Sequence, residues 1–227
     1  MSLQAERLAR RDNLGARRIE LMSLVALGSR RGRVVLVDTP AVLGVVEAPL
    51  KYVALLRGIN VGKGARVPMK TLKDLLEGLG LSNVVTYLNS GNVVFESGFS
   101  ASELTQLIEE ELERAFGEQI PTLVKTSAEM IEIAESVPSE WGNNDGEQTY
   151  VAYLFSDVAI PSLVSELPVK RQFMSIFYAH EAIIWNIKRE NYNRSQITKI
   201  VGHSSYARMT TRNINTARKL AALCAGA

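Results

Sequence analysis

The clearest chemical potential lies in a glycine-rich, cationic stretch, RGINVGKGAR, at residues 57–66. Glycine permits positive φ angles and leaves backbone N–H groups open to a ligand. A helix is expected to begin at Pro68, and its N-terminus would add a favourable potential for an anion. The stretch therefore predicts a phosphate or carboxylate site built from Arg57, Asn60, Gly62, Lys63 and Arg66. The alternative is a tight connection whose glycines only satisfy backbone geometry.

The spacing of these glycines excludes two common nucleotide-binding motifs. Three residues separate Gly58 from Gly62, where a Walker A loop has four. Gly64 follows Lys63, where that loop needs Ser or Thr. A dinucleotide fingerprint would need a third small residue after Gly64, and none occupies the required position. Any anion site here is therefore of another kind, and no cofactor is expected.

A second candidate region is the basic C-terminal part of the chain. Residues 170–227 carry 10 Lys+Arg and only 2 Asp+Glu, interleaved with aromatic and asparagine side chains. Aromatic rings can stack on bases while cations hold phosphates. The candidate ligand-binding residues are Asn191, Tyr192, Lys199, Arg212 and Asn213. Nucleic-acid (RNA) binding is the alternative function, although the aromatic-rich signature of RNA-recognition modules is missing. The simpler interpretation is a solvated basic face, with Asn213 or Asn215 capping the last helix.

The turn at residues 89–92 has the composition of either a hairpin or an anion-binding nest. Ser90 and Asn92 would face a ligand in the second case, and would only shape a turn between two strands in the first. Both interpretations stay open, with Ser90 and Asn92 as candidate ligand-binding residues.

Catalytic patterns are few. His180 and His203 show no metal-ligand spacing, and no metal site is predicted. Either histidine could act as a general base on Ser90 if the fold brought them together. An enzyme acting on a phosphate ester or acyl group is therefore a third hypothesis, and whether the chain is an enzyme stays open.

Composition limits the class of protein. The 227 residues are 46% hydrophobic and 22% charged, which suits a packed core. No stretch approaches the roughly 20 apolar residues of a membrane helix, so no membrane partner is expected. The single Cys224 excludes an internal disulfide. These features predict a cytoplasmic protein.

The order of elements predicts an α+β fold. Strands are expected at residues 51–57, 84–88, 93–96 and 119–125, with helices after Pro68 and after a Ser100–Glu103 capping box. This β-α-β-β-α-β order is that of a ferredoxin-like unit. A second, related α+β half is expected to follow. It would have strands at 149–155, 173–178 and 183–188 and short helices at 128–135 and 161–167. Helices at 195–201 and 215–223 would complete it.

Three domains or segments are accordingly predicted. Residues 1–50 form an N-terminal extension, either disordered or translated from a misplaced start. Residues 51–126 form the ferredoxin-like half. Residues 127–227 form the second half, with its basic helical C-terminus.

Three stretches also resemble one known family. They are YVALLRGINVGKGARVPM at residues 52–69, TYLNSGNVVF at 86–95, and NYNRSQITKIVG with MTTRNINTARKL at 191–220. Together they resemble the bacterial family called domain of unknown function 1697, over about residues 51–223. The resemblance implies a compact α+β cytoplasmic protein and no particular activity. Lys63 replaces a common second glycine and Ile214 a common aromatic residue, so any stacking contact of that aromatic is absent here.

Overall fold

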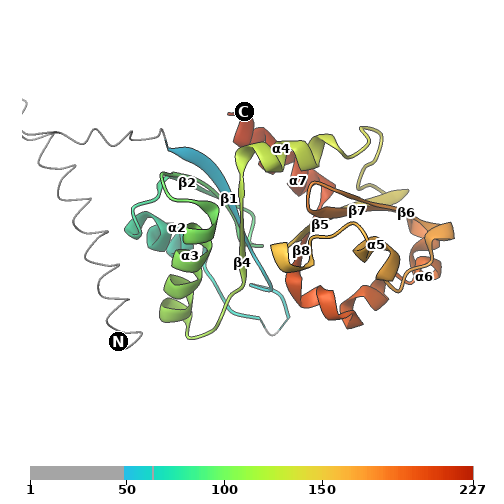
Figure 1. Ribbon diagram of the computed structural model, residues 1–227, viewed down its shortest axis with the longest axis horizontal. Helices are drawn as coiled ribbons and strands as arrows, with labels where there is room; N and C mark the ends of the chain where they lie inside the picture. Colours follow the sequence, from blue (N-terminus) through green and yellow to red (C-terminus); the bar gives the residue numbers. More distant parts are fainter. Residues whose placement is uncertain (1–48, 63, 227) are drawn as a thin grey trace, which may run out of the picture. The chain divides into compact units, whose positions relative to one another are not determined.

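The computed structural model describes residues 49–62 and 64–226. The predicted N-terminal extension therefore lies almost wholly outside the described residues, and so does Lys63. The described chain has an α+β fold with two four-stranded sheets (Figure 1). The first half contains, in order, β1 (Leu50–Leu56), α2 (Met69–Gly78), β2 (Ser82–Tyr87), β3 (Asn92–Ser97), α3 (Ala101–Phe116) and β4 (Thr122–Thr126). Its strands are ordered β2-β3-β1-β4, and every neighbouring pair is antiparallel.

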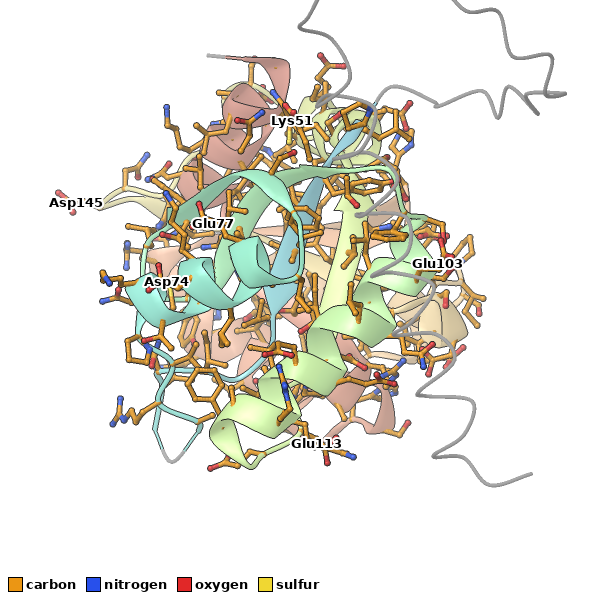
Figure 2. The ribbon with its side chains drawn as sticks, turned by 90° about the vertical axis from the view of Figure 1, so that its left-hand side faces the viewer. Lys51, Asp74, Glu77, Glu103, Glu113 and Asp145 are labelled. Atoms are coloured by element: carbon orange, nitrogen blue, oxygen red, sulfur yellow. The ribbon has the colours of Figure 1, made fainter. Side chains whose placement is uncertain are left out.

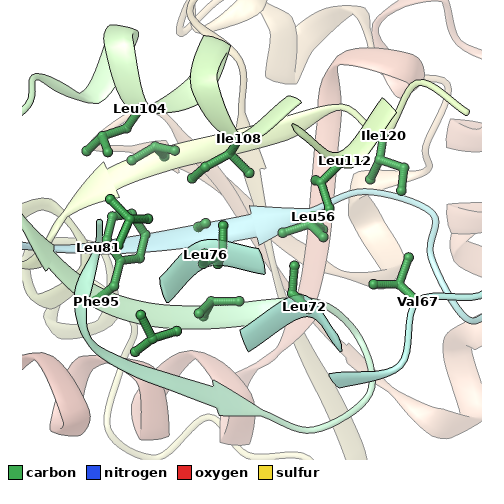
Figure 3. Close-up of a cluster of buried hydrophobic side chains, with 14 of the residues drawn as sticks. Leu56, Val67, Leu72, Leu76, Leu81, Phe95, Leu104, Ile108, Leu112 and Ile120 are labelled. Atoms are coloured by element: carbon green, nitrogen blue, oxygen red, sulfur yellow. The ribbon is translucent and has the colours of Figure 1, made fainter. Parts of the chain in front are cut away.

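Helices α2 and α3 cover one face of the first sheet, and the hydrophobic spacing explains why. Alternate residues of β1 point to opposite faces, so Tyr52, Ala54 and Leu56 join this core. The helices contribute Leu72 and Leu76 from α2 and Leu104, Ile108 and Leu112 from α3 (Figure 3). Acidic residues occupy the opposite, solvent-exposed sides of the same helices, among them the labelled Asp74, Glu77 and Glu113 of Figure 2.

The predicted start of α3 at the Ser100–Glu103 capping box is confirmed. The Ser100 hydroxyl accepts a hydrogen bond from the Glu103 N–H, and the Glu103 carboxylate accepts one from the Ser100 N–H. The helix ends where Gly117 adopts the left-handed conformation with φ of 72°. Both signals were readable in the sequence because they depend only on local geometry.

The second half repeats the strand order of the first. It contains α4 (Ser127–Glu135), β5 (Glu147–Leu154), α5 (Leu163–Glu166), β6 (Ser175–Ala179), β7 (Ala182–Lys188), α6 (Tyr192–Ser195), β8 (Met209–Asn213) and α7 (Ile214–Ala225). Five 3₁₀ segments lie between them: η1 (Ser156–Val158), η2 (Arg171–Phe173), η3 (Arg189–Asn191), η4 (Ile197–Gly202) and η5 (Ser204–Arg208). The antiparallel sheet has the order β6-β7-β5-β8, which matches β2-β3-β1-β4 position by position.

A second hydrophobic core joins the two halves. Val53 and Leu55 leave β1 on the face opposite α2 and α3, and they pack with Val151 and Tyr153 of β5. Helices α4 and α7 complete this core with Met130, Ile133, Ile214, Ala217 and Leu220. The far face of the second sheet packs against α5 and η4 in a third core. No helix within the described residues is long and apolar enough to span a bilayer.

Two predictions for the C-terminal part were wrong. Residues 209–213 form the strand β8, where no strand was expected. The stretch predicted as a helix at 195–201 is mostly the 3₁₀ segment η4. Strand β8 escapes a pattern search because Arg212 occupies a buried position on it, so the strand does not alternate between apolar and polar residues.

The first core yields a stability prediction. Ile108→Ala should lower the free energy of unfolding by about 2–5 kcal/mol, because it removes a fully buried side chain and leaves a cavity. Urea denaturation monitored by circular dichroism measures the change. Glu113→Ala, on the exposed side of the same helix, should change it by less than about 0.5 kcal/mol. Equal effects of the two substitutions would contradict the packing described here.

Candidate functional site

The structure places Arg57 of the glycine-rich stretch against residues 206 and 209 of the basic C-terminal part. Arg57 directly follows β1, and its side chain extends across to the second half. Its Nε donates to the Met209 carbonyl at 3.1 Å and its Nη2 to the Tyr206 carbonyl at 3.2 Å. The guanidinium also lies 5.2 Å from the centre of the Tyr206 ring, within cation–π range. Arg57 thus has carbonyl partners, and its Nη1 makes no hydrogen bond to the described residues.

Arg212 crosses in the opposite direction, from β8 to the first half. The side chain is 8% exposed, and each of its five N–H donors has an acceptor. The acceptors are the Asn92 Oδ1 for Nε, the Thr210 Oγ1 and Thr211 carbonyl for Nη1, and the Leu56 and Ser90 carbonyls for Nη2. Burial lowers the pKa of Arg212 to about 10, which still keeps the guanidinium charged at neutral pH. Arg212 therefore has no donor left for a ligand.

The turn carrying Ser90 and Asn92 is a hairpin connection whose polar groups serve this arginine. The fully buried Asn92 donates from Nδ2 to the Tyr87 carbonyl and to the Ser90 Oγ, both at 2.9 Å. Gly91 between them has φ of 70°, and a Cβ there would lie 2.6 Å from the Leu56 Cβ. The turn is therefore fixed closely against the end of β1.

The glycine loop (residues 58–66) is held by its own hydrogen bonds. The Asn60 amide donates to the Val67 and Asn89 carbonyls at 2.8 and 2.9 Å and accepts from the Val67 N–H at 2.9 Å. A Cβ at Gly64 would lie 1.9 Å from the Gly58 carbonyl oxygen, so the loop closes only with glycine at that position. Gly62, with φ of 52°, lies exposed near the tip.

Beside this loop lies a shallow, open depression of about 380 Å³ at the start of α2. Its lining comprises Asn60, Arg66, Val67, Pro68, Met69 and Asn89. Arg66 is exposed and has neither a hydrogen bond nor an ion pair to any described residue. Helix α2 begins without a side-chain cap and without an acidic residue in its first turn. The depression therefore combines a free cation with uncapped backbone N–H groups.

Sequence reasoning placed Asn60 and Arg66 at this position but missed Asn89. Its backbone carbonyl holds Asn60, while its side chain makes no hydrogen bond to the described residues. Asn89 belongs to the predicted turn at residues 89–92, but its residue type alone does not distinguish a turn residue from one that lines a depression.

The remaining candidate residues lie elsewhere. Asn213 caps α7 by accepting a hydrogen bond from the Thr216 N–H at 2.9 Å, as the capping interpretation predicted. Asn191 and the exposed Tyr192 and Lys199 lie on η3, α6 and η4 of the second half. The one side-chain hydrogen bond of Asn191 to the described residues comes from Arg194.

The histidines form no catalytic pair with Ser90. His180 lies 3.4 Å from Glu132, at the turn between β6 and β7. The Nδ1 of His203 lies 2.7 Å from the Ser205 Oγ and accepts the Ser205 N–H at 3.3 Å. This contact caps the segment η5, and Ser205 is buried, so its hydroxyl is not presented to a substrate. Within residues 49–62 and 64–226, no cluster of His, Cys, Asp or Glu could hold a metal ion.

Comparison with known proteins agrees with the family resemblance. The model of a protein family described as "Protein of unknown function (DUF1697)" matches residues 50–185. The fold is similar to that of the conserved bacterial protein SP0830 from Streptococcus pneumoniae, with a TM-score of 0.67 and 26% sequence identity. That similarity covers 78% of this chain and 99% of the other. No curated protein matches.

The hydrogen bonds of Asn60 lead to a prediction for the loop. Asn60→Ala should lower the free energy of unfolding by about 2–3 kcal/mol, because three hydrogen bonds are lost and alanine is strained at φ of 55°. Amide hydrogen exchange at Val67 should also become faster. Asn89→Ala, which removes no such bond, should cost less than about 0.5 kcal/mol. An unchanged exchange rate at Val67 would refute this role of Asn60.

Proposed function

The chain belongs to the DUF1697 family, and we propose that it binds a phosphorylated or otherwise anionic small molecule in the depression at the start of α2. The observation that carries the proposal is the position of Arg66. It is an exposed cation in the lining of the depression, and no described side chain neutralises it. A guanidinium can bind two oxygens of a phosphate or carboxylate at once.

Backbone donors support the same ligand chemistry. Because Pro68 and the first residues of α2 lack a side-chain cap, the N–H groups of Met69 and Lys70 point out of the helix without intrahelical partners. An anion there would complete their hydrogen bonding and interact favourably with the helix dipole. The Asn89 amide, which also belongs to the lining of the depression, would orient the rest of the ligand.

Two residues that the sequence predicted to bind the ligand, Arg212 and Asn92, do not contact it in this proposal. Arg212 and Asn92 are hydrogen-bonded to each other, and Arg212 also donates to backbone carbonyls. In this proposal they therefore support the site rather than contact the ligand. Arg57 keeps its Nη1 group available, and Gly62 and Lys63 belong to the same loop. The volume of about 380 Å³ suits a small molecule rather than a dinucleotide.

The two sheets have the same strand order. We propose that each half is a ferredoxin-like unit, since both sheets share one strand order and the β-α-β-β order of β1, α2, β2 and β3 recurs in β5, α5, β6 and β7. In the second half, short helical segments replace the long helix that α3 provides in the first.

Nuclear magnetic resonance titration tests the proposal. Inorganic phosphate, AMP and glucose 6-phosphate are added separately at low ionic strength to the full chain, because exposed charges are screened by salt. At least one of them should shift the amide signals of Met69 and Lys70 in a saturable manner. Arg66→Ala should weaken that binding about tenfold or more, as expected for loss of a charge-assisted hydrogen bond.

The matched control is Arg114→Ala, which removes an exposed arginine from α3 that is paired with Glu111. It should leave the affinity unchanged. The proposal fails if none of the three anions shifts these amides at millimolar concentration, or if Arg66→Ala binds as tightly as the unaltered chain.

A further inference from the structure

A second cationic surface lies in the other half of the molecule, far along the chain from Arg66. It is formed by residues of η2, η3, α6, η4 and the end of β7. We call it the basic face and define it by Lys170, Arg171, Lys188, Arg189, Arg194 and Lys199, all of which are exposed.

Direct contacts hold these segments together. The Lys170 N–H donates to the Ser195 carbonyl at 2.8 Å, which joins the residue before η2 to α6. The Arg194 guanidinium lies 4.1 Å from the centre of the Phe173 ring, joining the same two elements through side chains. The end of β7, η3, α6 and η4 follow one another directly along the chain, at residues 182–188, 189–191, 192–195 and 197–202. In Figure 1, α6 lies at the far right of the second half, on the side away from β1 to β4.

Two carboxylates lie near the basic face, Glu190 in η3 and Glu147 of β5, which is the cross-strand partner of Lys188, but neither forms an ion pair with the cations described here. Between residues 168 and 208 the acidic residues are Glu181 and Glu190. Glu181 pairs with Lys125 of the first half, and Arg208 is taken up by Asp157. Among the described residues, none of the six cations of the basic face forms an ion pair. Three of them bond instead to neutral oxygens: Arg171 to the Val164 carbonyl, Arg189 to the Asn144 carbonyl and Arg194 to the Asn191 side chain.

Groups able to contact bases lie among these cations. Tyr192, the first residue of the four-residue helix α6, is 36% exposed. Ser195, the last residue of the same helix, is buried. Asn193 is exposed beside Tyr192 and offers both a donor and an acceptor. The Arg194 guanidinium stacks on Phe173 with one face and is exposed on the other. Planar groups of this kind stack on unpaired bases.

We propose that the basic face binds single-stranded nucleic acid, with its cations on the phosphates and Tyr192 stacked on a base. A membrane surface fits less well, because Tyr192 and Val201 are the large hydrophobic side chains exposed on these described elements and form no amphipathic helix. An acidic protein would satisfy the cations but not the exposed ring. This binding goes beyond the small-anion site and uses none of its residues.

Fluorescence anisotropy with labelled 20-nucleotide oligo(U) and oligo(dT) tests the proposal on the full chain. Binding should be measurable at 50 mM salt and should weaken as salt rises, because counterions are released from the phosphates. About four phosphate contacts would give a slope of log K against log salt of about −3. Tyr192→Ala should weaken binding about tenfold without changing that slope, since stacking carries no charge.

A triple variant tests the phosphate contacts. Lys170→Gln, Lys188→Gln and Lys199→Gln together remove three side chains that bond to no described residue, so the fold should be retained. Binding should weaken at least tenfold, and the slope should become shallower by about 2. The matched control, Lys73→Gln with Arg114→Gln and Lys219→Gln, changes the net charge equally on α2, α3 and α7 and should have little effect.

Three results would overturn the proposal. The first is an absence of oligonucleotide binding at 50 mM salt. The second is an equal loss of affinity in the control triple variant, which would indicate attraction by net charge alone. The third is equally tight binding to polyglutamate or to phosphatidylserine vesicles together with full affinity of Tyr192→Ala, which would assign the basic face to another partner.

Discussion

The buried guanidinium of Arg212 links the two halves by hydrogen bonds, in addition to the hydrophobic core that they share. From β8 it reaches the end of β1 and the β2–β3 turn, and all five of its donors find acceptors there or on β8 itself. A buried cation without a carboxylate partner is costly unless its hydrogen bonding is complete. Here the carbonyls of Leu56 and Ser90 and the amide of Asn92 complete it. Because the Ser90 turn also carries Asn89, the same interaction fixes one wall of the depression at the start of α2.

Other cations also form bonds between the two halves. Lys125 of β4 is 3% exposed and pairs with Glu181 at 2.8 Å and with Glu129 at 3.2 Å. Burial raises the pKa of Glu129, but hydrogen bonds from Thr126 and the charge of Lys125 outweigh it, so the pKa is lowered overall. Arg57 meets carbonyls of the second half. Some cations thus join the two halves, whereas Arg66 and the basic face are exposed without an ion pair to the described residues and are open to external anions.

Local sequence patterns predicted much of the fold but little of the site. The capping box at Ser100 and the left-handed Gly117 depend only on neighbouring residues, so α3 was predictable. Strand β8 was not, because Arg212 occupies a core position, and three of its five acceptors lie more than a hundred residues away in sequence. Because several hydrogen-bond partners of Arg57, Asn92 and Arg212 lie far away in sequence, the sequence alone predicts these residues as ligand-binding groups. A sequence shows that Arg57, Asn92 and Arg212 are polar, but only the tertiary structure shows that each already has partners within the protein.

A double-mutant cycle between Arg212 and Asn92 tests this account most directly. The free energy of unfolding is measured by urea denaturation for Arg212→Met, Asn92→Leu and the double variant. If the two side chains share a direct buried hydrogen bond, the double variant should lose less free energy of unfolding than the two single variants lose together. The difference should be about 1–3 kcal/mol. Arg212→Met combined with Ile108→Ala in the separate first core should be additive within about 0.5 kcal/mol. Additive effects of the Arg212 and Asn92 substitutions would contradict the account, because they would mean that the guanidinium does not hold the two halves through Asn92.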